Sequence, residues 1–175
     1  MPFLMVYLAP NEAIISSLSV AKLSEWIILS CSKTASFVLP LLERLNVEHT
    51  HRGKRVRALI ITPTRELTEQ VETNVAQYAK YLDLTSMAMY GGIDSEPQRK
   101  RLIEGVDILV ATPGRLLEMI YQRAVHFDEL EILVLDEADR MLNMGFIDDI
   151  NKVIDRLPTK RQSMLFSATL SQRVA

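Results

Sequence analysis

Two adjacent carboxylates directly follow an apolar segment in the last third of the sequence. Residues 132–135 read Ile-Leu-Val-Leu, and they are followed by Asp136, Glu137 and, two positions on, Asp139. A strand that ends in this way can hold Mg²⁺ beside a nucleotide, because the ion keeps most of its water shell and takes few protein ligands. The second carboxylate can orient or deprotonate an attacking water. The alternative is an acidic junction that only caps the next helix.

Three other apolar segments also end in polar, turn-forming residues. Residues 57–61 lead into Thr62-Pro63-Thr64-Arg65, residues 107–111 into Thr112-Pro113-Gly114-Arg115, and residues 163–166 into Ser167-Ala168-Thr169. Short continuous apolar runs are typical of strands that are buried on both faces, as in parallel sheets. Ligands of open α/β sheets bind outside the carboxyl ends of the strands. We therefore expect all four signatures to lie on one rim.

The residues between these apolar segments show hydrophobic positions at helical spacing. The pattern predicts helices over residues 34–46, 65–82, 96–104, 115–122 and 145–157, and a strand over 85–90 that ends at Gly91-Gly92. Residues 1–32 form a divergent N-terminal segment in which 26–30 are a candidate first strand. Strands that alternate with helices predict an α/β fold with a parallel sheet and right-handed crossovers.

The motifs also resemble those of a known family. The resemblance is carried by Pro63-Thr64-Arg65-Glu66-Leu67, Gly91-Gly92, Thr112-Pro113-Gly114-Arg115, Asp136-Glu137-Ala138-Asp139 and Ser167-Ala168-Thr169. In this order and spacing they resemble the first RecA-like domain of DEAD-box ATP-dependent RNA helicases, and residues 35–45 and 141–155 look most like the bacterial RhlE-type branch. The resemblance covers residues 33–175. It implies a RecA-like sheet of the P-loop NTPase type, flanked by helices and incomplete at the N-terminus, with the second RecA-like domain absent from the chain.

The resemblance implies an ATP site. Lys33 and Thr34 would bind the nucleotide, and Asp136, with Thr34, would hold Mg²⁺, in the case of Asp136 through water. Glu137 would polarise the hydrolytic water.

A further contact would tie this site to the segment that senses RNA. By resemblance, Asp139 would pair with Ser167 or Thr169. The alternative for these two hydroxyls is simple capping of a loop.

The resemblance also implies an RNA-binding rim. It consists of Thr64, Arg65, Gly91, Gly92, Thr112, Gly114 and Arg115. Glycines let phosphate oxygens approach backbone N–H groups, helix N-termini attract anions, and arginine binds phosphate through two nitrogens. Contacts of this kind position a backbone without reading sequence. Turns and helix starts are the alternative explanation of the Thr-Pro pairs and the glycines, and both can hold at once.

The sequence departs from the family in the phosphate-binding loop, Ala-x-Thr-Gly-x-Gly-Lys-Thr. Residues 27–32 read Ile-Ile-Leu-Ser-Cys-Ser before Lys33-Thr34, so both glycines are serines. A left-handed conformation at a residue with a Cβ costs roughly 1–2 kcal/mol. Residues 1–26 contain no glutamine to read an adenine. We expect severely weakened binding of ATP and Mg²⁺.

Composition narrows the class of protein. The chain has 175 residues, of which 48% are hydrophobic. Its net charge of −2 gives no indication of nucleic-acid binding, for which a basic surface is the usual sign. A single cysteine, Cys31, indicates a reducing, cytoplasmic setting. We see no membrane anchor. The three histidines are expected at the surface, and Met141, Met144 and Met164 in the core.

The resulting hypothesis is the first domain of an ATP-dependent RNA helicase, which couples ATP binding and hydrolysis to RNA duplex remodelling in its parent protein. The chain alone is expected to lack activity. Its partners would be RNA, bound through the backbone without sequence preference, and other RNA-processing proteins. The alternative is a non-catalytic RNA- or protein-interaction module derived from a helicase.

Overall fold

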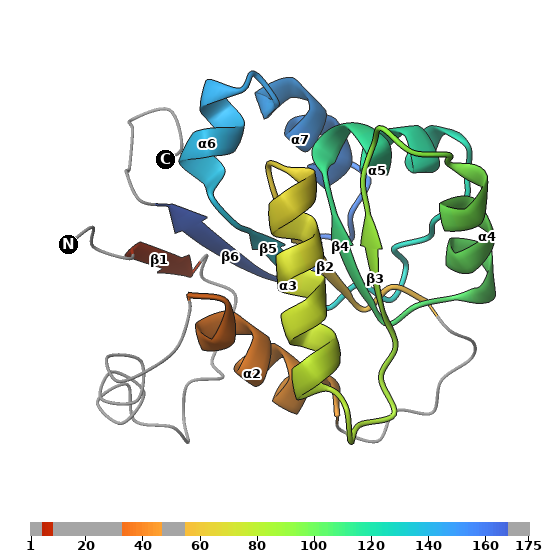
Figure 1. The fold of residues 1–175 in the computed structure, drawn as a ribbon. Helices are drawn as coiled ribbons and strands as arrows, with labels where there is room; N and C mark the ends of the chain where they lie inside the picture. The colour runs from red at the N-terminus through yellow and green to blue at the C-terminus, as the bar shows by residue number, and fades with distance from the viewer. Residues whose placement is uncertain (1–4, 9–32, 47–54, 168–175) are drawn as a thin grey trace.

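A computed structural model describes residues 5–8, 33–46 and 55–167, and these residues form one six-stranded sheet. The strands are β1 (Met5–Leu8), β2 (Ala58–Ile61), β3 (Ser86–Met89), β4 (Ile108–Ala111), β5 (Ile132–Leu135) and β6 (Gln162–Ser167). Their order is β1-β6-β5-β2-β4-β3 (Figure 1). The five strands from β6 to β3 are parallel, as the sequence predicts, and β1 pairs with β6 antiparallel.

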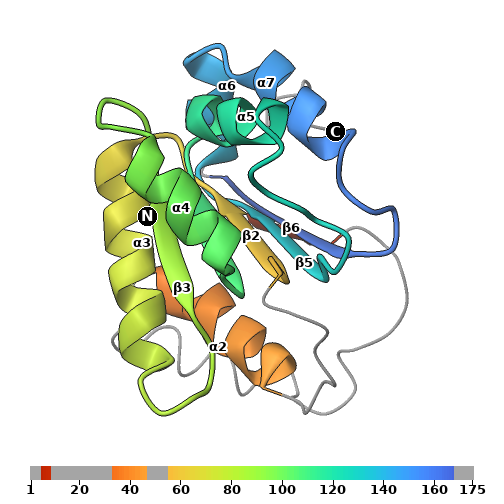
Figure 2. The same ribbon diagram turned by 90° about the vertical axis from the view of Figure 1, so that its right-hand side faces the viewer.

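Helices cover both faces of this sheet (Figure 2). They are α2 (Lys33–Leu45), α3 (Arg65–Tyr78), α4 (Glu96–Glu104), α5 (Pro113–Tyr121), α6 (Ala138–Asn143) and α7 (Ile147–Ile154). Side chains of α2 and α3 pack on one face, in a cluster that includes Phe37, Leu41 and Val71. Side chains of α4 to α7 form a second cluster on the other face. The central strands are therefore covered twice, which explains why their sequences are continuous apolar runs.

The elements predicted within the described residues are present, with ends that differ by up to four residues. Every residue of β2 and β4 is buried, and the side of α2 that faces the sheet is at most 3% exposed at Phe37, Leu41, Leu42 and Leu45. The helix predicted over 65–82 ends at Tyr78, and that over 145–157 covers only Ile147–Ile154. The candidate strand at 26–30 lies outside the described residues, and β1 was not predicted.

The expectation of three core methionines is wrong for Met144. Met141 is fully buried and Met164 packs against the core, but Met144 is 48% exposed. Met144 is the last residue before Gly145, whose φ of 82° ends α6 in a left-handed turn. The helix predicted from residue 145 is preceded by this separate short helix, so Met144 lies at the turn and not on an inward face. His126 is exposed as expected, whereas His49 and His51 lie outside the described residues.

None of the helices in the described part of the chain is long and apolar enough to cross a membrane.

Candidate nucleotide and nucleic-acid site

The carboxyl ends of the central strands lie side by side. Ile61 is in register with Ala111 on one side and with Leu135 on the other, so β2, β4 and β5 end at the same level. Leu135 is in register with Leu165, and β6 runs on to Ser167. The polar residues that follow these strands are therefore brought to one rim, as the sequence predicts.

Asp136 is the buried acid of this rim. Its side chain is 2% exposed, and Oδ1 forms an ion pair with Nζ of Lys33 in the first turn of α2. Within the described residues this oxygen has no hydrogen bond of regular geometry, so the ion pair is its main polar contact. Burial raises the pKa of Asp136, while the Lys33 ammonium opposes the rise. A carboxylate held in this way demands a cation beside it, because burial disfavours its charged form.

Glu137 stands in an unusual backbone conformation. Its φ and ψ are 53° and 48°, in the left-handed region, where a residue with a Cβ costs roughly 1–2 kcal/mol. It precedes α6 but its side chain makes no capping bond, so the helix-cap alternative does not account for it. The carboxylate is 33% exposed and lies 3.2 Å from Nη1 of Arg140. Such strain is often stored at functional sites, and here the strained residue places a partly exposed acid beside the buried Asp136.

The next two predicted residues lie on neighbouring elements. Asp139 is in the first turn of α6, Ser167 is the last residue of β6, and α6 contacts β6. Ser167 is 2% exposed. Thr169 lies outside the described residues, so the proposed pairing of Asp139 with Ser167 or Thr169 remains a prediction.

The described donors suit a water-rich Mg²⁺ ion. Asp136 offers a buried oxygen that is paired with the Lys33 ammonium, and Thr34 lies in the first turn of α2, where backbone N–H groups favour phosphate. Across residues 5–8, 33–46 and 55–167 no three His, Cys, Asp or Glu side chains come together in a metal cage. Mg²⁺ needs no such cage, because it is usually held by one or two carboxylates and substrate phosphates. Residues 27–32 lie outside the described residues.

Thr64 and Arg65 begin α3. Thr64 has extended backbone angles, and its hydroxyl accepts a hydrogen bond from the backbone N–H of Leu67 at 3.3 Å. Beneath it the buried hydroxyls of Thr62 and Thr68 are 2.6 Å apart, and Thr68 donates to the Thr64 carbonyl at 2.8 Å. These hydrogen bonds cap and order the start of α3, and the side chain of Arg65 is 48% exposed there.

The segment Gly91-Gly92 is exposed and held at both ends. Gly92 has a φ of 82°, which favours glycine, and a Cβ at either position would meet nothing within 4 Å. The buried Gln98 brackets the preceding residue: its Oε1 accepts from the Tyr90 N–H and its Nε2 donates to the Tyr90 carbonyl, both at 3.2 Å. On the other side, Nη2 of Arg115 donates to the Ile93 carbonyl at 2.8 Å.

Arg115 is therefore placed differently from Arg65. Its side chain is 7% exposed, and Nε lies 3.0 Å from Glu118. In this arrangement it links α5 to the Gly91-Gly92 segment. Thr112 precedes Pro113 at the start of α5, and Gly114 is exposed with open space around its Cα. Thr112-Pro113 is thus a helix start and Thr62-Pro63 a turn directly before the N-cap Thr64, as the structural alternative predicts, and a role in RNA binding remains a proposal.

Sequence reasoning missed Glu69, Tyr90 and Gln98. Glu69 lies four residues after Arg65 on α3, a spacing that predicts a pair on one helix face. Nothing local links Tyr90 to Glu69 or Gln98, because these contacts join the residue that follows β3 to α3 and α4.

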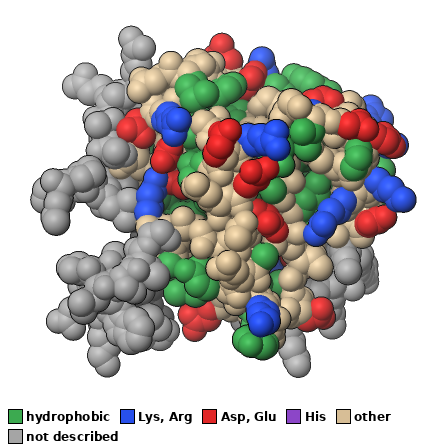
Figure 3. Space-filling model, viewed as in Figure 1, with side chains coloured by type: hydrophobic (Ala, Val, Ile, Leu, Met, Phe, Trp, Pro, Cys, Tyr) green, Lys and Arg blue, Asp and Glu red, His purple; other side chains and the backbone are tan. Residues whose placement is uncertain are grey.

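Charge is mixed over the face seen in Figure 3. Lys and Arg side chains alternate there with Asp and Glu, and no broad basic patch stands out. Any binding of phosphate on this face must depend on individual cations.

Comparison with known proteins decides the family. The model of the DEAD/DEAH box helicase family matches residues 31–175. The chain belongs to this family. Among DEAD-box relatives, a probable ATP-dependent RNA helicase ddx27 of Dictyostelium discoideum is 45% identical over 143 residues, which are 81% of this chain and 18% of that protein. The ATP-dependent RNA helicase RhlB of Pseudomonas syringae is 45% identical over 148 residues, which are 81% of this chain and 37% of that protein.

A solved DEAD-box protein has the same architecture. The crystal structure of the yeast splicing factor Prp28 superposes with a TM-score of 0.75 at 31% identity, over 83% of this chain and 36% of that one. This chain thus spans well under half the length of each of these proteins.

Proposed function

We propose that this chain is the ATP-binding domain of a DEAD-box ATP-dependent RNA helicase, which in its parent protein couples ATP binding and hydrolysis to RNA remodelling. The observation that carries the proposal is the contact between Lys33 and the buried Asp136 at the carboxyl edge of the sheet, beside the strained Glu137. ATP, bound with Mg²⁺, would supply the phosphoanhydride bond that is hydrolysed.

The side chains present have distinct tasks in this proposal. With ATP and Mg²⁺ bound, Lys33 would contact phosphate, and Asp136 with Thr34 would hold the metal and its water shell. Glu137 orients the attacking water and accepts its proton. Asp139 would pair with Ser167 or Thr169 and so link the nucleotide site to the segment that senses RNA.

RNA is proposed to bind along Thr64, Arg65, Gly91, Gly92, Thr112, Gly114 and Arg115. Two helix N-termini and an exposed glycine turn can contact phosphates without reading bases. Assignment to the RhlE-type branch, a cytoplasmic location and association with other RNA-processing proteins remain proposals of the same kind.

Nucleotide hydrolysis by this chain alone is expected to be at background level. The reason is the pair of serines, Ser30 and Ser32, at the glycine positions of the phosphate loop, because a residue with a Cβ disfavours the backbone angles that glycine permits. The measurement is phosphate release with and without RNA, compared with the Glu137→Gln variant. Release above that variant, stimulated by RNA, contradicts the expectation of inactivity.

RNA binding by this chain is expected to be weak and carried chiefly by Arg65, the more exposed of the two rim arginines. Arg65→Ala should weaken binding to single-stranded RNA and make the slope of log affinity against log salt shallower by about 0.7 for each phosphate that is no longer neutralised. Fluorescence anisotropy at several salt concentrations measures both. Arg99→Ala is the matched control, because Arg99 is an exposed arginine on α4 that pairs with Glu96. Equal effects of the two substitutions would indicate a diffuse charge effect and not a rim contact.

A non-catalytic RNA-binding module is the second candidate. The altered phosphate loop beside an intact rim favours it. Parallel titrations with labelled ATP and labelled RNA separate the two functions, since a module binds RNA alone.

A further inference from the structure

Three side chains from two elements form a cluster beside the Gly91-Gly92 segment. Arg65 and Glu69 lie one turn apart on α3, and Tyr90 follows β3. The Arg65 guanidinium lies over the Tyr90 ring, 4.7 Å from its centroid. The Tyr90 hydroxyl donates a hydrogen bond to Oε1 of Glu69. The same Oε1 accepts from Nε of Arg65 at 3.3 Å.

This cluster orients the guanidinium in two ways. The tyrosine ring covers one of its faces, and the contact with Glu69 uses Nε. That contact leaves the edge formed by Nη1 and Nη2 for an external anion, and this edge is one that binds phosphate through two parallel hydrogen bonds. Arg65 and Glu69 are each nearly half exposed, so a phosphate can reach the site.

Tyr90 itself is held firmly. Gln98 brackets its backbone through two hydrogen bonds, and Ser86, at the start of β3, donates to Glu72 on α3 at 2.8 Å. Because Tyr90 directly precedes Gly91, its ring has a defined position relative to the glycine turn. The hydrogen bond from Tyr90 lowers the pKa of Glu69, so the carboxylate remains ionised near neutral pH.

We propose that Glu69 and Tyr90 are positioning residues that hold Arg65 ready for a phosphate of the RNA backbone, and so couple the start of α3 to the Gly91-Gly92 turn. The proposal rests on the proposed RNA-binding rim and deepens it. In this proposal neither Glu69 nor Tyr90 binds RNA directly, and both act by orienting Arg65.

A competing role for Glu69 predicts the opposite sign. If its carboxylate competed with phosphate for Arg65, its removal would strengthen RNA binding. The geometry favours positioning, because Glu69 also accepts a hydrogen bond from the Tyr90 hydroxyl, and its contact with Arg65 is long and confined to Nε.

The test compares RNA affinity in four variants of the full chain. Glu69→Ala and Tyr90→Leu should each weaken binding about two- to fivefold, as expected for removing a cation–π interaction or its support at an exposed site. Glu69→Gln should retain most of the affinity, because an amide oxygen can still accept from Tyr90. Glu43→Ala removes an equal charge from an exposed position on α2, outside the rim and the Arg65 cluster, and should leave affinity unchanged. Tighter binding by Glu69→Ala would overturn the proposal in favour of competition.

A second measurement stands apart from RNA binding. The Nε–H signal of Arg65 in a ¹H–¹⁵N NMR spectrum should report an ordered guanidinium in the unsubstituted chain and in Glu69→Gln, and an averaged one in Glu69→Ala and Tyr90→Leu. If the unsubstituted chain binds no RNA, the proposed function fails, yet this signal still decides whether Glu69 and Tyr90 hold Arg65 in place. An averaged signal in the unsubstituted chain refutes the positioning role.

Discussion

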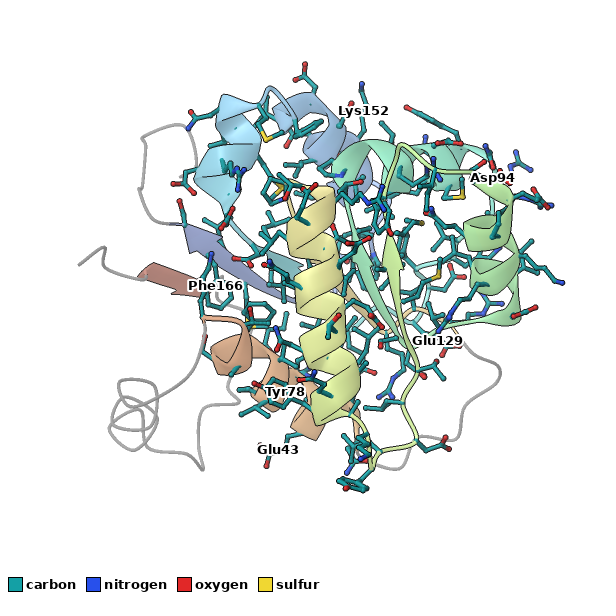
Figure 4. All side chains as sticks on the ribbon, in the orientation of Figure 1. Glu43, Tyr78, Asp94, Glu129, Lys152 and Phe166 are labelled. Atoms are coloured by element: carbon teal, nitrogen blue, oxygen red, sulfur yellow. The ribbon has the colours of Figure 1, made fainter. Side chains whose placement is uncertain are left out.

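Replacing Phe37 by alanine is expected to lower the free energy of unfolding by about 3–5 kcal/mol, the cost of removing a buried phenyl ring and leaving a cavity. Phe37 is 1% exposed, and its ring centroid lies 5.0 Å from that of Phe166 at an interplanar angle of 45°. Figure 4 labels Phe166, a residue of β6 that lies beside the start of α2. This ring pair joins the helix that carries Lys33 to the strand that ends at Ser167.

Leu39→Ala is the matched control, because Leu39 is on the same helix and is 52% exposed. Its expected effect is below about 1 kcal/mol, since little apolar surface leaves a buried site. Urea denaturation followed by circular dichroism measures both. Similar destabilisation of the two variants would mean that α2 does not depend on its contact with β6.

Rebuilding the phosphate loop is expected to produce the largest gain in ligand binding. Residues 27–32 are replaced by Ala-Gln-Thr-Gly-Ser-Gly, which restores two glycines ahead of Lys33-Thr34. If each glycine relieves roughly 1–2 kcal/mol of backbone strain, nucleotide affinity should rise by a factor of about 30 to 1000. Mg²⁺-dependent binding should then become measurable by calorimetry, though weak, because no glutamine in residues 1–26 reads the adenine.

Lys33→Ala in the rebuilt chain is the control for that gain. It removes the ammonium that neutralises Asp136 in the ion pair, and nucleotide binding should disappear with it. Strong binding that survives Lys33→Ala would show that the nucleotide sits elsewhere. If the rebuilt chain binds no nucleotide, the defect lies in the first strand expected within residues 1–30 and not in the loop alone.

The sequence by itself determined the strands of the parallel sheet and the rim. Runs such as Ile132–Leu135 are apolar throughout because both faces of a central strand are covered, and that pattern is local. The chemistry of the rim was equally local, since Asp136 and Glu137 directly follow such a run. Family membership came from motif order alone, and the comparisons confirm it.

Element ends and side-chain contacts depended on the tertiary structure. Met144 was expected in the core but lies at the turn where Gly145 ends α6. Arg57 was assigned to a strand, yet its side chain is 2% exposed, bonded to Glu131 at 2.8 Å and to the Leu45 carbonyl at 2.9 Å. An arginine can be buried only when such partners arrive from other elements, and the local sequence does not contain them.

The site itself was decided by the order of the strands. β5 lies between β2 and β6, although β3 and β4 intervene along the chain, and this order places Asp136 within reach of Lys33, 103 positions earlier in the sequence. The same topology buries Arg115 against the glycine turn and brings Tyr90 under Arg65. Local sequence sets which residues end each strand, but which of those ends become neighbours depends on how hydrophobic faces are buried across the whole sheet.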